Sequence, residues 1–411
     1  MKLHPLFIVS FFIVHCFIVH CSFFIVMPAL DLALSQFQKS FHSSPQFIVR
    51  SPGRVNLLGE HVDYNDGWVL PIAIDRATYL AARKRDDDQL SIIAVDLDSH
   101  IQLPTSNFEL PTWSRYPCGV AHVLREANLN VSGIDCAFSS DVPRGAGLSS
   151  SASVELAFAV AWQKLGEWSL SKMELAQLCQ KAENEFVGVN CGIMDQFACA
   201  HGEIDHALLL DCRSLEWTPV PLPQGVAVVI ADTTKRRELG KSEYNNRRAA
   251  CEEASRLLGI KALRDISLEE FNKREHLLPP LIAKRARHVV EECDRTLMAV
   301  EALKRNDLES FGHAMNESHR TLRDLYEVSC MELDAMVSAA QSLEGCYGAR
   351  LTGAGFGGCA VALVDASVAK DFEHELAKRY EKATGLKAEI YVCKASEGAN
   401  ILSDPSDPKG L

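Results

Sequence analysis

The chain has 411 residues, and its 42 Lys and Arg against 54 Asp and Glu give a formal net charge of −12. Hydrophobic residues make up 47% and charged residues 23%, which is ordinary globular composition and excludes intrinsic disorder and collagen-like chains. The negative charge excludes a general nucleic-acid binder, because phosphate contacts need clustered cations.

The first 27 residues differ from the rest of the chain. Residues 6–26 contain no formal charge and are long enough to cross a bilayer. The triplet Phe-Ile-Val recurs in this stretch, at residues 7–9, 12–14, 17–19 and 24–26. Such low complexity is unlike a signal peptide or an ordinary helix, and Met27 follows at once. We interpret residues 1–27 as an apolar extension from a wrongly assigned start codon, with a targeting or membrane segment as the alternative.

Apolar runs rich in β-branched residues predict strands, the first of which ends at a turn over Ser51–Gly53. Helical patterns dominate the second half. The predicted strands are 47–50, 69–80, 90–95, 134–138, 207–210, 226–231, 359–364 and 388–392. The predicted helices are 119–127, 152–165, 172–186, 242–258, 282–303, 307–326 and 371–384. We therefore expect an α+β protein with an antiparallel-rich first domain at 28–215, a second domain at 216–411, and a frayed tail after Ser403.

The cysteines are scattered and predict no metal or redox site. There are 14 of them, and no two have the Cys-x-x-Cys spacing of a zinc or redox motif. Scattered thiols in a chain of this length are typical of a reducing compartment. We expect a cytoplasmic protein, with no membrane association unless residues 6–26 are retained.

A glycine- and serine-rich segment opens the predicted helix 152–165. Glycines allow several backbone N–H groups to face one point, and a helix N-terminus adds unpaired donors and partial positive charge. The segment is therefore a candidate phosphate cradle, although a serine-rich cap of an ordinary helix gives the same local pattern. It is not a Walker A loop, since the one Gly-Lys-Ser sequence, at 240–242, has Lys235 where the first glycine belongs. The candidate residues are Gly145, Ala146, Gly147, Leu148, Ser149, Ser150 and Ser151.

A second glycine cluster, at residues 351–358, contains the pattern Gly-x-Gly-x-x-Gly. These glycines precede the predicted strand 359–364 and do not open a helix, which excludes a dinucleotide fingerprint. We expect a packed loop that lies against a ligand or another backbone segment.

A dense polar cluster follows the first predicted strand. Glu60, His61 and Asp63 lie close together, and Arg54 is available to neutralise charge beside them. Neighbouring carboxylates and a histidine suit a ligand with many hydroxyl groups. A solvated loop is the alternative for this segment taken alone.

The three motifs, taken in their order along the chain, resemble the GHMP kinase superfamily. Residues 53–65 resemble its galactokinase signature. The resemblance extends to residues 191–197 (Cys-Gly-Ile-Met-Asp-Gln-Phe) and 242–244 (Ser-Glu-Tyr), and covers roughly residues 47–395. One departure is Val62, where the galactokinase pattern usually has threonine. The resemblance implies a two-domain GHMP kinase fold, with a ribosomal-S5-domain-2-like first domain, a ferredoxin-like second domain, and the active site in the cleft between them.

The resemblance also implies residue roles. Asp195 takes the place of the family's catalytic aspartate and Arg54 that of the arginine beside it. Residues 145–151 match the phosphate loop, and Ser151 and Glu183 match magnesium-associated positions. The positions that match sugar-binding residues are Glu60, His61, Asp63 and Tyr244.

The implied reaction is transfer of a phosphoryl group from ATP, with Mg²⁺, to C1 of α-D-galactose, the first step of the Leloir pathway. A sugar hydroxyl is too weakly acidic to ionise at neutral pH, so a carboxylate at Asp195 would accept its proton, and Arg54 would keep that carboxylate ionised. The alternatives are a related sugar-1-kinase for N-acetylgalactosamine, arabinose or galacturonate, suggested by Val62, and a non-catalytic sensor of galactose and ATP. The intact serines 149–151 favour the enzyme.

Overall fold

The computed structural model describes residues 28–104, 111–236 and 240–402. The predictions on residues 1–27 and on the tail after Ser403 therefore lie outside the described residues, as does the side chain of Ser242. The helices are α1 (Ala29–Phe41), α2 (Arg115–Glu126), α3 (Ser150–Gly166), α4 (Lys172–Lys181), α5 (Met194–His201), α6 (Gly240–Leu258), α7 (Leu268–Arg274), α8 (Pro280–Lys304), α9 (Leu308–Thr321), α10 (Met331–Gln341) and α11 (Ala369–Thr384). The strands are β1 (Phe47–Asn56), β2 (Trp68–Val69), β3 (Pro71–Lys84), β4 (Gln89–Ala94), β5 (Ser99–Pro104), β6 (Ile134–Ser140), β7 (His206–Asp211), β8 (Trp217–Pro221), β9 (Val226–Asp232), β10 (Cys346–Leu351), β11 (Cys359–Asp365), β12 (Glu389–Cys393) and β13 (Asn400–Leu402).

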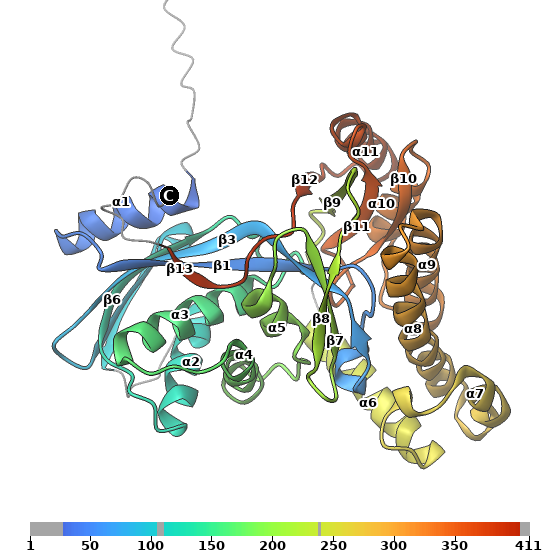
Figure 1. The fold of residues 1–411 in the computed structure, drawn as a ribbon, viewed down its shortest axis with the longest axis horizontal. Coiled ribbons are helices and arrows are strands. Elements are labelled where there is room, and N and C mark those ends of the chain that lie inside the picture. Colours follow the sequence, from blue (N-terminus) through green and yellow to red (C-terminus); the bar gives the residue numbers. More distant parts are fainter. Residues whose placement is uncertain (1–27, 105–110, 237–239, 403–411) are drawn as a thin grey trace, which may run out of the picture.

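The first half of the chain is built on a six-stranded sheet in the order β13-β1-β3-β6-β4-β5. All neighbouring strands are antiparallel except β4 and β6, as the antiparallel-rich prediction required. Helix α1 covers one face through Ala33 and Phe37, and α2 and α3 lie on the other (Figure 1). Helix α3 is apolar nearly all round, which is why it is buried in the core.

The second half contains a four-stranded antiparallel sheet in the order β10-β11-β9-β12. Its strands alternate between two apolar layers, because successive side chains of a strand point to opposite faces. Val229 and Ala360 pack with α10 and α11, whereas Val228 and Val361 pack with residues of α8 and α9. The long helices α8 and α9 pack against each other beside this sheet (Figure 1).

The chain passes from the second half back into the first at its end. Strand β13 pairs with β1, so that Val49 lies opposite Ile401. A separate three-stranded sheet, β2-β7-β8, lies next to α8. The two halves are therefore joined by strand pairing as well as by the chain connection near 210–230.

Strand β1 differs from the sequence prediction, which ended it at a turn over Ser51–Gly53. The strand continues through these residues to Asn56 and pairs with β3 along its whole length, with a register shift between Pro52 and Arg54. Gly53 is required there, because a Cβ atom would lie 2.8 Å from the carbonyl oxygen of Leu148. The Pro-Gly signal thus marks a bulge and a close backbone approach, and not a turn.

Two predicted helices end earlier than expected. The α-helical part of 172–186 ends at Lys181 and is followed by a π-helical turn over Ala182–Val187. Likewise α9 ends at Thr321 and a π-helical turn covers Leu322–Tyr326. Such turns shift the direction of side chains relative to the preceding helix and are frequent at functional sites.

The twelve cysteines within the described part of the chain are all free thiols. Over the described residues, no helix combines the length and apolar character needed to cross a membrane.

Candidate active site

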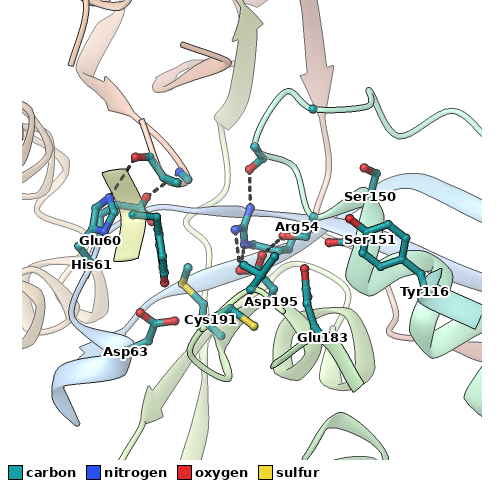
Figure 2. Close-up of a pocket in the computed structure, with 18 residues that line it drawn as sticks. Arg54, Glu60, His61, Asp63, Tyr116, Ser150, Ser151, Glu183, Cys191 and Asp195 are labelled. Carbon is teal, nitrogen blue, oxygen red and sulfur yellow. Dashed lines mark hydrogen bonds and ion pairs between the residues drawn. The ribbon is translucent and has the colours of Figure 1, made fainter. Parts of the chain in front are cut away.

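One cavity of about 520 Å³ brings together most of the predicted site residues. Figure 2 shows Glu60, His61 and Asp63 at one end, Ser150, Ser151 and Glu183 at the other, and Arg54 and Asp195 between them. The cavity lining is Arg54, Glu60, His61, Asp63, Tyr116, Gly145, Gly147, Ser149, Ser150, Ser151, Glu183, Val189, Cys191, Met194, Asp195, Tyr244, Gly353 and Ala354. Of the predicted residues, Ala146 and Leu148 are fully buried and do not line it.

Asp195 lies in the first turn of α5 and is held on both carboxylate oxygens. Arg54 donates to Oδ1 from Nε (2.9 Å) and Nη2 (2.6 Å), and Ser149 Oγ donates to Oδ2 (2.7 Å). Burial alone would lower the pKa of the Arg54 guanidinium, but Asp195 and Glu60 beside it raise the pKa above its usual value. The Asp195 side chain is 27% exposed, so the carboxylate is fixed in orientation and still open to the cavity.

The glycine- and serine-rich segment forms the N-terminal side of α3. Gly145 and Gly147 have φ of +68° and +87°, which glycine adopts without strain. Arg54 Nη1 donates to the carbonyl oxygen of Gly147 (2.6 Å), so one guanidinium joins the loop to Asp195 of α5. Ser149 was predicted as a phosphate-loop residue, yet its hydroxyl points to Asp195, while Ser150 and Ser151 begin the helix and line the cavity.

The polar cluster after β1 forms the opposite end of the cavity. Glu60 Oε2 accepts hydrogen bonds from Arg350 Nη2 (2.6 Å) and from the backbone N–H of Gly353 (2.9 Å). Among the described residues no hydrogen bond to Glu60 Oε1 is present, so this oxygen can accept one from a ligand hydroxyl. Both Arg350 and Gly353 come from the second half of the chain, which therefore fixes this carboxylate.

His61 lies among aromatic rings at the same end. Its Nδ1 is 2.8 Å from Tyr64 Oη, and its Nε2 is 3.2 Å from the carbonyl oxygen of Ala354. The ring of Tyr244 packs on it with the ring centroids 5.5 Å apart. The backbone of His61 has φ of +62°, in the left-handed region, and this places the imidazole toward the cavity.

Asp63 packs directly against the segment that contains Asp195. A Cβ atom on Gly192 would lie 2.0 Å from Asp63 Oδ2, so a larger residue at this position would displace the Asp63 side chain. Burial, together with the charges of Asp195 and Glu60, raises the pKa of Asp63 from 3.8 to about 7. The carboxyl group therefore changes protonation near neutral pH.

Glu183 lies in the π-helical turn after α4, at the end of the cavity that Ser150 and Ser151 line. Burial and the charge of Asp195 raise the pKa of Glu183 to about 7, and hydrogen bonds from Ser151 and Gln196 oppose this increase. Gln196 Nε2 also contacts the buried carboxylate of Glu155, at 3.1 Å. The hydroxyl and carboxylate oxygens of Ser151 and Glu183 are the hard ligands that Mg²⁺ prefers. Among the described residues, no group of three or more His, Cys, Asp or Glu could hold a metal by itself.

Val62, the departure from the expected signature, does not line the cavity. Its side chain is fully buried in the core, and Gly67 packs against it so closely that a Cβ on Gly67 would lie 2.7 Å from Val62 Cβ. The residue therefore belongs to the packing behind the polar cluster.

Comparisons with known proteins find family models that match three parts of the chain. Family models match as the galactokinase galactose-binding signature (residues 35–84), the GHMP kinases N terminal domain (115–203) and the GHMP kinases C terminal domain (299–382). A galactokinase of Roseiflexus sp. (strain RS-1) is 50% identical over 91% of this chain and 97% of its own length. The chain belongs to the galactokinase family.

Two further relatives of this galactokinase-family chain extend the comparison. A galactokinase of Haemophilus influenzae is 45% identical, over 92% of this chain and 100% of its own. The crystal structure of Lactococcus lactis galactokinase complexed with galactose has 37% identity and a TM-score of 0.86, covering 89% of this chain and 98% of the other. The GHMP kinase fold expected from the motifs is thereby confirmed.

Sequence reasoning missed several residues of the galactokinase-family site. Gly353 and Ala354 lie in the glycine cluster 351–358, for which the sequence predicts a packed loop against a ligand or another backbone segment; both line the cavity, although neither is among the predicted site residues. The same loop contacts backbone, since a Cβ on Gly355 would lie 2.1 Å from the carbonyl oxygen of Val328. Tyr116 follows the start of α2 and belongs to no motif, so only the folded structure reveals it.

The raised pKa of Asp63 predicts a pH-dependent stability. A carboxyl with a pKa of about 7 in the folded protein and 3.8 otherwise binds more protons when folded, so its contribution to stability falls as pH rises from about 4 to 7. We expect Asp63→Asn to match the wild type near pH 4 and to melt about 5 °C higher at pH 8. Scanning calorimetry between pH 4 and 8 measures this, with the exposed Asp98→Asn as control. A difference in melting temperature that does not change with pH would contradict the prediction.

Proposed function

We propose that this chain is an ATP-dependent galactokinase that phosphorylates α-D-galactose at C1 and yields galactose 1-phosphate. The observation that supports it best is the position of Asp195, fixed by Arg54 and Ser149 between a cluster of sugar-binding type and a helix N-terminus. The sugar-binding end contains Glu60, His61, Asp63 and Tyr244 in the same cavity.

In this proposal Asp195 is the general base. Its carboxylate accepts the proton of the C1 hydroxyl as the oxygen–phosphorus bond forms. Arg54 orients that carboxylate through two N–H groups and provides positive charge beside the transferring phosphoryl group. Phosphoryl transfer requires positioning and charge stabilisation above all, and both groups are held by several contacts each.

The nucleotide would occupy the other end of the cavity. The N-terminus of α3 and the glycines at 145 and 147 present backbone N–H groups for the phosphates. A second cavity, of about 120 Å³, shares Tyr116, Ser150 and Ser151 with the first, and its other walls are largely apolar. Trp113, Leu97 and Phe138 line it, which suits the aromatic base of ATP.

Magnesium fits beside Ser151 and Glu183. These residues supply a hydroxyl and a carboxylate at the phosphate end, and phosphate oxygens would complete a coordination shell that Mg²⁺ rarely takes from protein alone. When bound, the ion balances the charge of the phosphate groups.

The proposed function is tested by measuring ADP release from the full chain with ATP, Mg²⁺ and a panel of sugars. We expect release with galactose and little with glucose, N-acetylgalactosamine, arabinose or galacturonate. A site built around hydrogen bonds to a hydroxyl rejects a sugar that leaves those groups unpaired. Binding of galactose by folded protein without ADP release would instead support the sensor.

Galactose is favoured over the other sugars because Val62, the residue that suggested them, lies outside the cavity. We expect Val62→Thr to leave the ratios of kcat/KM between sugars unchanged within about twofold, since the hydroxyl would lie in the core and not against the substrate. The same sugar panel measures this ratio. A change in sugar preference would show that the packing behind the cluster selects the substrate.

A cytoplasmic location is part of the proposal. The twelve free thiols within the described residues are typical of a reducing compartment, and a galactokinase would encounter ATP there. Neither nucleic acid nor a protein partner is needed for the reaction proposed.

A further inference from the structure

The turn that follows β1 is bound from behind by a buried carboxylate on α8. Glu292 is fully buried, and its Oε1 accepts hydrogen bonds from the backbone N–H groups of Gly59 (3.0 Å) and Glu60 (3.2 Å). Ser318 of α9 donates a third hydrogen bond to the same oxygen (2.7 Å), and Arg295 pairs with Oε2. One carboxylate thus joins two consecutive amides of the turn to the second half of the chain.

The backbone of the turn is shaped for such an anion. Gly59 has φ of +85°, and a Cβ there would lie 2.3 Å from the carbonyl oxygen of Trp68. Consecutive N–H groups that converge in this way form a concave anion site. Although burial raises the pKa of Glu292, the charges of Arg295, His288 and Arg350 outweigh it and lower the pKa to about 2, so the group stays ionised.

Other groups from the second half of the chain hold the same residue. His288, one turn before Glu292 on α8, lies with Nε2 3.2 Å from the carbonyl oxygen of Glu60. Arg350 of β10 binds the Glu60 side chain, as described above. Three buried side chains therefore fix Glu60: Glu292 binds its N–H, His288 its carbonyl oxygen and Arg350 its carboxylate. Of these three, Glu292 alone also binds Gly59, the preceding residue.

We propose that Glu292 is a positioning residue for sugar binding: it sets the turn at Gly59–Glu60 so that Glu60 and His61 face the substrate. The inference rests on the proposed function, since it assumes that the cavity takes galactose. Glu292 does not line the cavity, so it acts through the backbone and touches no substrate. Its loss should weaken galactose binding and leave the nucleotide end, which depends on residues 145–151, unchanged.

The test compares the full-length wild type with Glu292→Gln and with Thr296→Val as a matched control. Gln keeps the shape but places a neutral amide against Arg295 and the turn. Thr296 lies four residues farther along α8, is equally buried, and bonds only the carbonyl oxygen of Glu292 in its own helix. For each protein, KM for galactose, KM for ATP and kcat are measured, with galactose affinity by calorimetry and the melting temperature.

We expect Glu292→Gln to raise KM for galactose and its dissociation constant about tenfold, because the hydrogen bonds to the turn lose the negative charge that strengthens them. KM for ATP should stay within twofold, and Thr296→Val should change neither KM. A merely structural role would lower the melting temperature of Glu292→Gln without separating the two KM values, and that result would overturn the proposal.

Two controls keep the outcome interpretable. If Glu292→Gln does not fold, Ser318→Ala removes one donor to the same carboxylate, and we expect KM for galactose to rise about threefold; no rise would overturn the proposal. Absence of galactose-dependent ADP release in the wild type would be seen before any variant is compared. That result would overturn the proposed function, and with it the inference that depends on it.

Discussion

Replacement of Asp195 by asparagine is expected to lower kcat by about 10²–10⁴-fold, the usual contribution of a general base. An amide oxygen can still accept from Arg54, and the Ser149 hydroxyl can turn to accept from the amide nitrogen, so the geometry persists while the basicity is lost. Single-turnover and steady-state ADP release measure the effect.

Binding measurements separate the loss of the base from a loss of structure. Asp195→Asn should bind galactose within a few-fold of the wild type and melt at a similar temperature. Ser149→Ala is the matched control, because it removes the hydrogen bond to Oδ2 and keeps the carboxylate; its kcat should fall far less. A kcat of Asp195→Asn within tenfold of the wild type would show that this carboxylate is not the base.

The second large effect is expected at Arg54. Its side chain is 4% exposed and contacts Asp195 through two nitrogens and the carbonyl oxygen of Gly147 through the third. Lysine keeps the charge, but its single ammonium cannot form this planar set of bonds. We expect Arg54→Lys to lower kcat by about 10²–10³-fold, as for removal of one group that stabilises a transition state.

Arg50→Lys provides the control for Arg54. Arg50 is also on β1, and its guanidinium contacts Ser396 and the carbonyl oxygen of Glu397, outside the cavity. Its substitution should leave kcat unchanged. Combining Arg54→Lys with Asp195→Asn should cost less than the product of the two single effects, because the residues act as one unit. Fully multiplicative effects would indicate that Arg54 acts independently of the base.

Much of the fold could be predicted from the sequence because its elements have strong patterns. The apolar strand at 359–364 and the amphipathic helix at 282–303 both form, within one or two residues of the predicted bounds. The sequence patterns did not predict α10 and β10, which are short; in the structure Met336 and Val337 of α10 pack with Ala349 of β10 in one apolar layer. The Pro-Gly pair in β1 marks a bulge and not a turn because Gly53 approaches the backbone of Leu148, which is distant in sequence.

Some residues of the candidate site could likewise be predicted from the sequence, and others could not. Glu60 could be predicted because it lies in a compact polar cluster, and Asp195 because residues 191–197 resemble the galactokinase family. Glu292, Arg350 and His288 could not, since each reaches the site from more than 220 residues away along the chain, as in the Glu292–Glu60 separation of 232. A buried ion pair in a long helix has the same local sequence as a surface pair.

The pairing of β13 with β1 bears on how the protein is made. During synthesis β1 emerges long before β13, because the paired residues Val49 and Ile401 lie far apart along the chain. Until then the nascent sheet exposes unpaired N–H and C=O groups that other chains can join. Loss of β13, by a premature stop or by proteolysis before Asn400, should therefore promote aggregation of newly made protein even though every proposed catalytic group is present.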